Sequence, residues 1–268
     1  MHYIKRSELP ELLENSTESW TQPWIDYYRW IKSDDPKNVH PVKPTDGHWR
    51  KDDIRLKLIN DFHNNCGYCG NALPTPSLFA DIVDELNEEG ERVFASKGDV
   101  DHFLPKAIYP EKVYDWINYI WSCKPCNQLK LEFEDIKYPL LNPCEKSDCQ
   151  QLIYLESSGQ YGLKNVMRNN KYWQKRFKNS QIKTLMNAIE TGQERALKIS
   201  VLRQCFESIV VGLTMLKKLQ LPEIEKHIDK DVRLIKKTIV SPNFHYLLQE
   251  YYQLLQDDYP QVVPLLNE

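Results

Sequence analysis

The chain has 268 residues, of which 41% are hydrophobic, and its formal net charge at pH 7 is −3. This length and apolar content predict one or two folded domains and exclude a disordered or low-complexity chain. The charge is uneven, because residues 151–268 carry 17 Lys and Arg against 12 Asp and Glu, whereas residues 1–150 have a net charge of −8. A basic excess of this size is compatible with a phosphate-rich partner but does not require one.

Residues 1–62 are expected to be helical. Pro23 is placed to open one helix, because proline is favoured in a first turn. Apolar residues at every fourth position from Ile54 predict a second helix from Lys51 to Phe62. Residues 73–98 then contain a run of acidic side chains that we expect to be solvated.

The sequence predicts neither a secretory signal nor a membrane span. The first residues, Met1 to Arg6, lack the apolar segment of a signal peptide. The longest apolar stretch, Ile209 to Leu216, is too short to cross a bilayer. We therefore expect a cytoplasmic protein with no membrane association.

Four of the seven cysteines form two Cys-x-x-Cys pairs that are separated by 53 residues. Two such pairs supply four thiolates, which complete the closed tetrahedral shell of a structural zinc ion and leave no open position for catalysis. The alternatives are a redox pair or unrelated thiols, but in a cytoplasmic chain this pattern favours a metal. The expected zinc ligands are Cys66, Cys69, Cys123 and Cys126.

A group of polar residues is interleaved with these cysteines. The segment Asp99 to Lys106 reads Asp-Val-Asp-His-Phe-Leu-Pro-Lys and places a carboxylate beside an imidazole. An asparagine follows 16 residues after the histidine, a second one nine residues later, directly behind the second cysteine pair, and a lysine one helical turn further. Each residue alone has a simpler explanation as a turn residue or a solvated charge, but their shared register favours a catalytic site. The members of this group are Asp101, His102, Asn118, Asn127 and Lys130.

Residues 164–183 contain seven Lys and Arg, no acidic residue and three interleaved aromatic residues. A channel for flexible or single-stranded nucleic acid needs cations that contact the phosphate backbone and aromatic rings that stack on the bases. An amphipathic helix whose aromatic rings pack inward is the equally weighted alternative. The residues expected to contact nucleic acid are Lys106, Lys171, Lys175 and Arg176.

The C-terminal region, residues 146–268, is expected to be mostly helical. Apolar residues on one face predict a helix from Pro222 to Val240. A last helix is expected to be capped by Asn243 and to run to Gln256.

The interleaved pattern resembles the HNH nuclease family. Its order of Cys-x-x-Cys, Asp-His-x-x-Pro, Asn and Cys-x-x-Cys-(His/Asn)-x-x-Lys is met residue by residue over about residues 60–145. The resemblance implies an α+β fold, in which a mostly helical chain surrounds a small zinc-stabilised ββα-metal core. The expected regions are an N-terminal helical region (1–62), a nuclease core with the cysteine knuckle (63–145) and a C-terminal helical region (146–268).

The resemblance also implies a role for each site residue. His102 would be the general base that activates a water molecule. Asp101 and Asn127 would hold one Mg²⁺ or Mn²⁺, Asn118 would brace the loop that aims His102, and Lys130 would neutralise phosphate charge. Asn127 differs from the residue that gives the family its name at this position, which is frequently His. Its amide oxygen favours a hard cation, and the resemblance does not distinguish Mg²⁺ from Mn²⁺.

A narrower resemblance extends to the HNH subunit of the Septu anti-phage system, which also accompanies some retrons. The segments Asp-His-Phe-Leu-Pro-Lys, Cys-x-x-Cys-Asn and Tyr138 to Pro143 carry it. It implies the effector nuclease of a defence complex with a partner ATPase of the ABC/SMC kind. The sequence has no phosphate-binding Gly-x-x-x-x-Gly-Lys-(Ser/Thr) motif, so nucleotide hydrolysis would come from that partner.

Two other functions are compatible with the sequence. A stand-alone restriction or homing-type endonuclease would need its own sequence-reading element, and no helix-turn-helix or two-Cys, two-His finger is recognisable. A non-catalytic zinc module that binds nucleic acid or protein would keep the cysteines but not need His102. DNA is the expected substrate by resemblance, although the residues do not distinguish it from RNA.

Overall fold

The computed structural model describes residues 1–33, 42–44, 48–73 and 98–267. Contacts divide the chain into two compact units. The first unit consists of Met1, residues 3–152 and residues 163–186, and the second consists of His2, residues 153–162 and residues 187–268. Most of the acidic run at residues 73–98 lies outside the described residues. The division into three regions stays a prediction, and the two units are described separately below.

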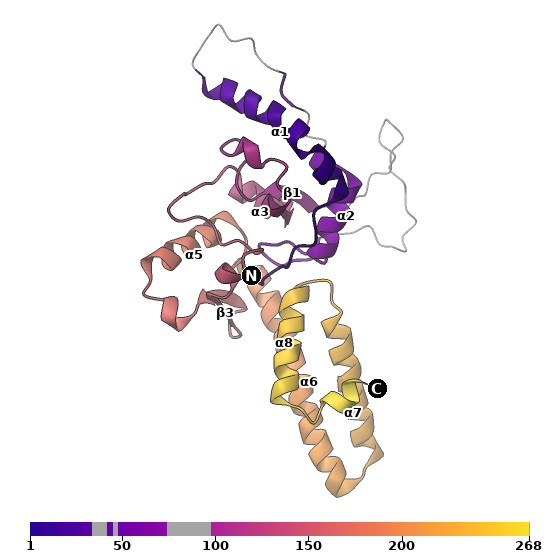
Figure 1. The fold of residues 1–268 in the computed structure, drawn as a ribbon. Helices are drawn as coiled ribbons and strands as arrows, with labels where there is room; N and C mark the ends of the chain where they lie inside the picture. The colour runs from indigo at the N-terminus through magenta and orange to yellow at the C-terminus, as the bar shows by residue number, and fades with distance from the viewer. Residues whose placement is uncertain (34–41, 45–47, 74–97, 268) are drawn as a thin grey trace. The chain divides into compact units, whose positions relative to one another are not determined.

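The described part of the chain is α+β and mostly helical, with two small sheets, as expected (Figure 1). The first unit contains α1 (Glu11–Lys32), η1 (His48–Arg50), α2 (Asp52–Asp61), β1 (Gly98–His102), η2 (Pro110–Lys112), η3 (Trp116–Asn118), β2 (Tyr119–Cys123), α3 (Lys124–Lys130), α4 (Lys146–Cys149), η4 (Asn165–Met167) and α5 (Lys171–Lys183). The short strands β3 (Leu152–Leu155) and β4 (Gln160–Leu163) form the second sheet, and the second unit contains α6 (Ile189–Leu219), α7 (Pro222–Ile239), α8 (His245–Asp258) and α9 (Val263–Leu266).

The N-terminal helix begins earlier than the sequence predicted. Helix α1 starts at Glu11, and Pro23 lies inside it instead of opening it. An internal proline removes one helical hydrogen bond, and the burial of Leu13 and Trp24 on either side of it compensates for that loss. The second predicted helix, Lys51 to Phe62, is confirmed as α2 within one residue at each end.

A β-hairpin followed by a helix carries four of the predicted site residues, Asp101, His102, Asn127 and Lys130. Strands β1 and β2 pair antiparallel, with Asp101 opposite Ile120 and His102 opposite Tyr119. Helix α3 follows β2 without a loop and packs against both strands (Figure 1). Strand β2 is buried over its first four residues because both of its faces are covered, whereas β1 exposes Asp99.

The second unit is built on helix packing. Helices α6, α7 and α8 pack on one another around a shared apolar core (Figure 1). The predicted helix from Pro222 is confirmed as α7, but the cap of the last helix is not Asn243. Helix α8 is preceded by Phe244 in a left-handed conformation, and the Asn243 amide donates instead to Glu194 Oε1 at 2.6 Å. Core residues of this unit include Leu202, Phe206, Ile209, Ile235, Leu248 and Leu255.

Helix α6 is longer than its apolar stretch suggested. The run from Ile209 to Leu216 is part of a 31-residue helix. By length and composition alone, this helix is able to cross a membrane. The same property is common in core helices of soluble proteins, and α6 supplies Leu202, Phe206 and Ile209 to the core of the second unit. One such helix is weak evidence for a membrane protein.

Candidate active site and metal centre

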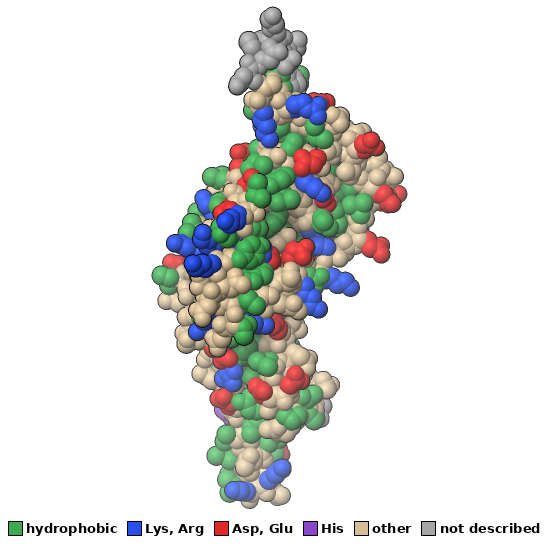
Figure 2. Space-filling view, turned by 60° about the vertical axis from the view of Figure 1, so that its left-hand side comes forward, with side chains coloured by type: hydrophobic (Ala, Val, Ile, Leu, Met, Phe, Trp, Pro, Cys, Tyr) green, Lys and Arg blue, Asp and Glu red, His purple; other side chains and the backbone are tan. Residues whose placement is uncertain are grey.

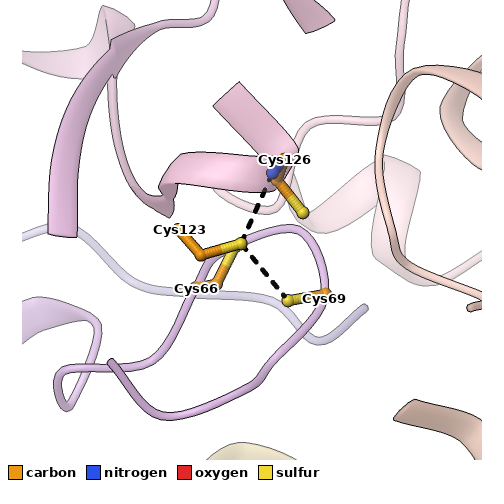
Figure 3. Close-up of side chains that lie close together, drawn as sticks. All are labelled: Cys66, Cys69, Cys123 and Cys126. Atoms are coloured by element: carbon orange, nitrogen blue, oxygen red, sulfur yellow. Dashed lines mark hydrogen bonds between the residues drawn. The ribbon is translucent and has the colours of Figure 1, made fainter. Parts of the chain in front are cut away.

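The four cysteines of the two Cys-x-x-Cys pairs converge in the first unit. Their Sγ atoms all lie within 4.8 Å of one another, and the sulfurs of Cys69 and Cys123 are 3.9 Å apart (Figure 3). Four thiolates around one zinc ion, each at about 2.3 Å, have sulfurs roughly 3.8 Å apart. The cluster is therefore compatible with zinc, and the four cysteines expected as ligands lie in one group.

The first cysteine pair sits in a tight turn that is tied to the sheet. The Cys66 amide donates to Asn71 O and the Gly70 amide to Cys66 O, both at 2.8 Å, with Gly70 at φ 75°. The Gly67 amide donates to the Trp121 carbonyl of β2 at 2.9 Å. A Cβ on residue 67 would lie 2.7 Å from the Phe62 ring, so this close approach requires glycine.

The second cysteine pair opens helix α3. The Cys123 sulfur caps the helix by accepting from the Cys126 amide at 3.5 Å, and Pro125 occupies the first turn, where its missing N–H costs nothing. The Leu185 amide donates to the Cys126 sulfur at 3.3 Å. Hydrogen bonding to Cys123 raises the pKa of the Cys69 and Cys126 thiols. A divalent cation would relieve the crowding of negative sulfurs, which is the electrostatic reason for a metal at this place.

Asp101 lies at the centre of a buried polar group. The residue is only 4% exposed. Tyr68, which stands between the first two cysteines, donates its hydroxyl to Asp101 Oδ2 at 2.5 Å, and Lys130 Nζ donates to Oδ1 at 3.1 Å. Burial raises the pKa of Asp101, while the Lys130 ammonium and the Tyr68 hydroxyl oppose that shift. Burial and the Asp101 carboxylate raise the pKa of Tyr68 well above its usual value, so its hydroxyl keeps its proton and donates.

The next residue along β1, His102, is held by its Nε2 atom. This nitrogen lies 2.9 Å from the Val113 carbonyl, which can only accept, so the neutral ring carries its proton on Nε2. Tyr119 OH donates to the same carbonyl at 2.9 Å. The Trp49 ring meets the imidazole edge-on at 4.9 Å between centroids.

This arrangement leaves the other ring nitrogen of His102 available. Among the described residues no hydrogen bond to Nδ1 is formed, and the atom is not fully buried. Burial, followed by the Lys106 ammonium, lowers the pKa of His102 to about 3. The imidazole is therefore neutral at physiological pH, with an accepting lone pair on Nδ1.

The two asparagines of the motif have different surroundings. Asn118 is buried and braces the loop after β1, since its Oδ1 accepts from Leu104 N at 2.7 Å and its Nδ2 donates to the carbonyls of Leu104 and Lys112. Asn127 is half-buried on α3, and its side chain makes no hydrogen bond within the described part of the chain. The amide oxygen of Asn127 is therefore available as a ligand.

Two lysines of the predicted site are engaged by the protein itself. Lys130 is 1% exposed and, besides Asp101, donates to the His102 carbonyl at 2.6 Å. Lys106 Nζ lies 4.8 Å from the centroid of the Trp24 ring and 4.5 Å from that of Trp49, a cation–π arrangement. Lys130 thus faces the interior of the first unit, although it was expected to face phosphate.

The predicted nucleic-acid contacts on helix α5 differ in their exposure. Lys171 and Lys175 are exposed, and Lys175 Nζ lies 4.3 Å from the centre of the Tyr138 ring. Arg176 is instead buried, and its two terminal nitrogens donate to the Asp148 carboxylate at 2.6 Å each. In Figure 2, turned so that the side of Figure 1 with α5 comes forward, Lys and Arg side chains gather beside hydrophobic ones.

Sequence reasoning missed several residues that hold the site together. Tyr68 stands at a spacer position between two cysteines, and its local sequence does not indicate that its hydroxyl reaches Asp101. Trp49 and the Val113 carbonyl could not be found, because nothing in their local sequence indicates that the chain folds back onto His102. The Asp148 partner of Arg176 was missed for the same reason.

A scan against models of known protein families finds no match. The chain is 30% identical over 143 residues to a protein from Bacillus thuringiensis named Septu protein PtuB. The alignment covers 53% of this chain and 42% of the relative, so the chain spans less than half the length of the relative that it matches. The similarity supports the expected relation to the Septu system, and the cysteine cluster beside the site is compatible with zinc.

Proposed function

We propose that this protein is a metal-dependent endonuclease of the HNH type that hydrolyses phosphodiester bonds of nucleic acid, with DNA as the preferred substrate. One observation carries the proposal: a hairpin and the helix that follows it bring Asp101, His102 and Lys130 into contact in the unit that holds the four-cysteine cluster. The ββα arrangement of the HNH core consists of these same elements in this order.

His102 is suited to act as the general base. Its Nε2–H bond to Val113 fixes the tautomer and aims Nδ1, which accepts a proton from water. The oxygen of that water forms the new bond to phosphorus while the bond from phosphorus to the leaving ester oxygen breaks. General-base catalysis of this kind is typically worth about 10²–10⁴ in rate.

Asp101 and Asn127 would hold the catalytic Mg²⁺ or Mn²⁺. The donor set fits a hard cation, because both side chains offer oxygen. Each oxygen of Asp101 accepts one donor in this structure, and an ionised carboxylate has about four lone-pair sites, so roughly two remain. When bound, such an ion stabilises negative charge on the phosphate and on the leaving oxygen.

The other residues have supporting roles in this proposal. Asn118 holds the loop after β1 and so aims His102. Lys106 and Lys130 bring positive charge to the site, Lys130 through its ion pair with Asp101. Lys171 and Lys175, the exposed pair on α5, would contact the substrate backbone, whereas Arg176 would act by holding α5 in place.

We further propose that the protein serves anti-phage defence together with a partner ATPase. The similarity to Septu protein PtuB supports the defence role, and the absence of a phosphate-binding loop in this sequence leaves nucleotide hydrolysis to another chain. Co-expression with the neighbouring open reading frame should give one peak in size-exclusion chromatography and altered cleavage. Separate elution with unchanged cleavage would refute the partnership.

The nuclease proposal is tested with His102→Ala, measured as cleavage of plasmid DNA, single-stranded DNA and RNA with Mg²⁺ or Mn²⁺. We expect a loss of about 100-fold or more in rate on the preferred substrate, with unchanged zinc content and melting. His227→Ala, an exposed histidine of the second unit, is the matched control and should cleave like the wild type.

Equal cleavage by the wild type and His102→Ala would remove the proposed base. A wild-type protein that binds nucleic acid but cuts none of the substrates, alone or with its partner, would instead identify a non-catalytic zinc module.

A further inference from the structure

The Asp101 carboxylate is held by two donors that come from the two arms of the cysteine cluster. Tyr68 belongs to the first Cys-x-x-Cys turn, between Cys66 and Cys69, and donates to Oδ2 at 2.5 Å. Lys130 ends helix α3, the helix that the second cysteine pair opens, and donates to Oδ1 at 3.1 Å. Each oxygen of the carboxylate therefore accepts a hydrogen bond from an element that carries a different cysteine pair.

Both anchors are immobilised by their surroundings. Tyr68 and Lys130 are each 1% exposed. The turn that carries Tyr68 is hydrogen-bonded to β2 through Gly67, and Lys130 makes a second bond to the His102 carbonyl. A carboxylate held at both oxygens by fixed donors has little freedom to rotate, so its remaining lone pairs point in set directions.

We propose that Tyr68 is a positioning residue for the Asp101 carboxylate, through which the cysteine cluster sets the geometry of the hard-cation site. The inference rests on the proposed function, because it takes Asp101 as a ligand of the catalytic ion. Tyr68 itself does not touch substrate, since its side chain is buried. Its effect passes through one hydrogen bond.

A purely structural role for the Tyr68 hydroxyl would give a different pattern. If the hydroxyl only stabilised the knuckle, its loss would release zinc or lower the melting temperature without a specific effect on a second metal. If it orients Asp101, its loss weakens binding of the hard cation while the cysteine cluster stays intact. Removing the hydrogen-bond partner of a metal ligand typically costs about 10–100-fold in metal affinity.

The experiment compares Mn²⁺ binding to the zinc-loaded full chain by electron paramagnetic resonance, which does not depend on cleavage. The test variant is Tyr68→Phe, which keeps the ring and removes only the hydroxyl. Tyr154→Phe removes a phenol hydroxyl in the second unit and is the matched control. Asp101→Asn reports whether the measured Mn²⁺ is at the proposed site.

We expect Tyr68→Phe to raise the Kd for Mn²⁺ about 10-fold, with full zinc content and an unchanged KM for nucleic acid. Tyr154→Phe should bind Mn²⁺ like the wild type. An unchanged Kd in Tyr68→Phe, an equal loss in Tyr154→Phe, or loss of zinc from Tyr68→Phe would each overturn the positioning role.

The failure of the proposed function gives a separate result. If Asp101→Asn binds Mn²⁺ as the wild type does, or if the wild type binds none, then Asp101 is not a ligand and both proposals fail together. If Asp101→Asn loses Mn²⁺ while Tyr68→Phe keeps it, only the positioning role fails.

Discussion

The two units of this protein build their interiors differently. The first unit buries charged side chains in pairs, Asp101 with Lys130 and Asp148 with Arg176, and places four cysteines together. The second unit buries mainly leucine, isoleucine and aromatic residues between helices. Apolar packing tolerates substitution of similar volume, whereas a buried pair of charges fixes the direction of each hydrogen bond. The proposed site, which depends on the orientation of the Asp101 carboxylate and the His102 imidazole, lies in the unit with the polar interior.

The second unit also buries charged side chains, among them that of Arg195, which is fully buried. Its guanidinium carbon lies over the rings of Tyr161 and Phe244, at 4.8 and 5.3 Å from their centroids, and its Nη1 donates to the Gly159 carbonyl at 3.1 Å. Two aromatic rings and a carbonyl are thus among the groups that surround this buried charge.

The largest expected effect is that of zinc removal, which should unfold the first unit and leave the helices of the second unit folded. Structural zinc contributes about 10 kcal/mol or more to the folding of small metal-dependent modules. A chelator should therefore unfold the first unit around Cys66 and α3 while α6, α7 and α8 keep their helical structure. Hydrogen exchange, followed segment by segment, measures this. Equal loss of protection in both units would show that their stabilities are not separate.

The next effect comes from breaking a buried charge pair. Arg176→Met leaves the Asp148 carboxylate buried and unpaired, which should cost about 3–5 kcal/mol in the free energy of unfolding of the first unit. Lys175→Met, one residue earlier and exposed, is the matched control and should change stability by about 0.5 kcal/mol or less. Urea unfolding followed by the tryptophan fluorescence of the first unit measures both. Equal losses would mean that the pair is not the source of the effect.

An effect of similar size in the other unit comes from Phe206→Ala. Phe206 is fully buried in the core of the second unit, and truncation of a buried phenylalanine costs about 3–5 kcal/mol. We expect helix protection to fall in α6 and α8, with zinc content and Mn²⁺ binding unchanged. Zinc release from this variant would contradict the separation of the two interiors.

The smallest effect concerns the exposed lysines of α5. Lys171→Ala with Lys175→Ala should leave stability unchanged. It should reduce the magnitude of the slope of log K against log[salt] for nucleic-acid binding by about 0.9 per lost phosphate contact on duplex DNA, or about 0.7 on single strands. Lys217→Ala with Lys218→Ala, an exposed pair near the end of α6, is the control. Fluorescence anisotropy at several salt concentrations gives the slopes, and equal slopes in both variants would remove α5 from the proposed interface.

The cysteine cluster was predictable from the sequence, and much of the fold was not. Two Cys-x-x-Cys spacings identify four candidate zinc ligands whatever the rest of the chain does, and the amphipathic pattern of α7 gives its bounds within one residue. The burial of Lys130 and Arg176 could not be predicted in this way. Each is buried beside an acidic partner that is distant in sequence, Asp101 or Asp148. Local propensity likewise misplaced the start of α1, since packing around Trp24 outweighs the internal proline.

In the proposed function, one hard cation binds beside His102, separate from the cysteine cluster. The decisive measurement is anomalous diffraction from crystals grown with Mn²⁺, because manganese and zinc are distinguished by their absorption edges. We predict one zinc peak among Cys66, Cys69, Cys123 and Cys126 and one manganese peak within coordination distance of oxygens of Asp101 and Asn127. A manganese peak that lies elsewhere, or none at saturating Mn²⁺, would contradict it.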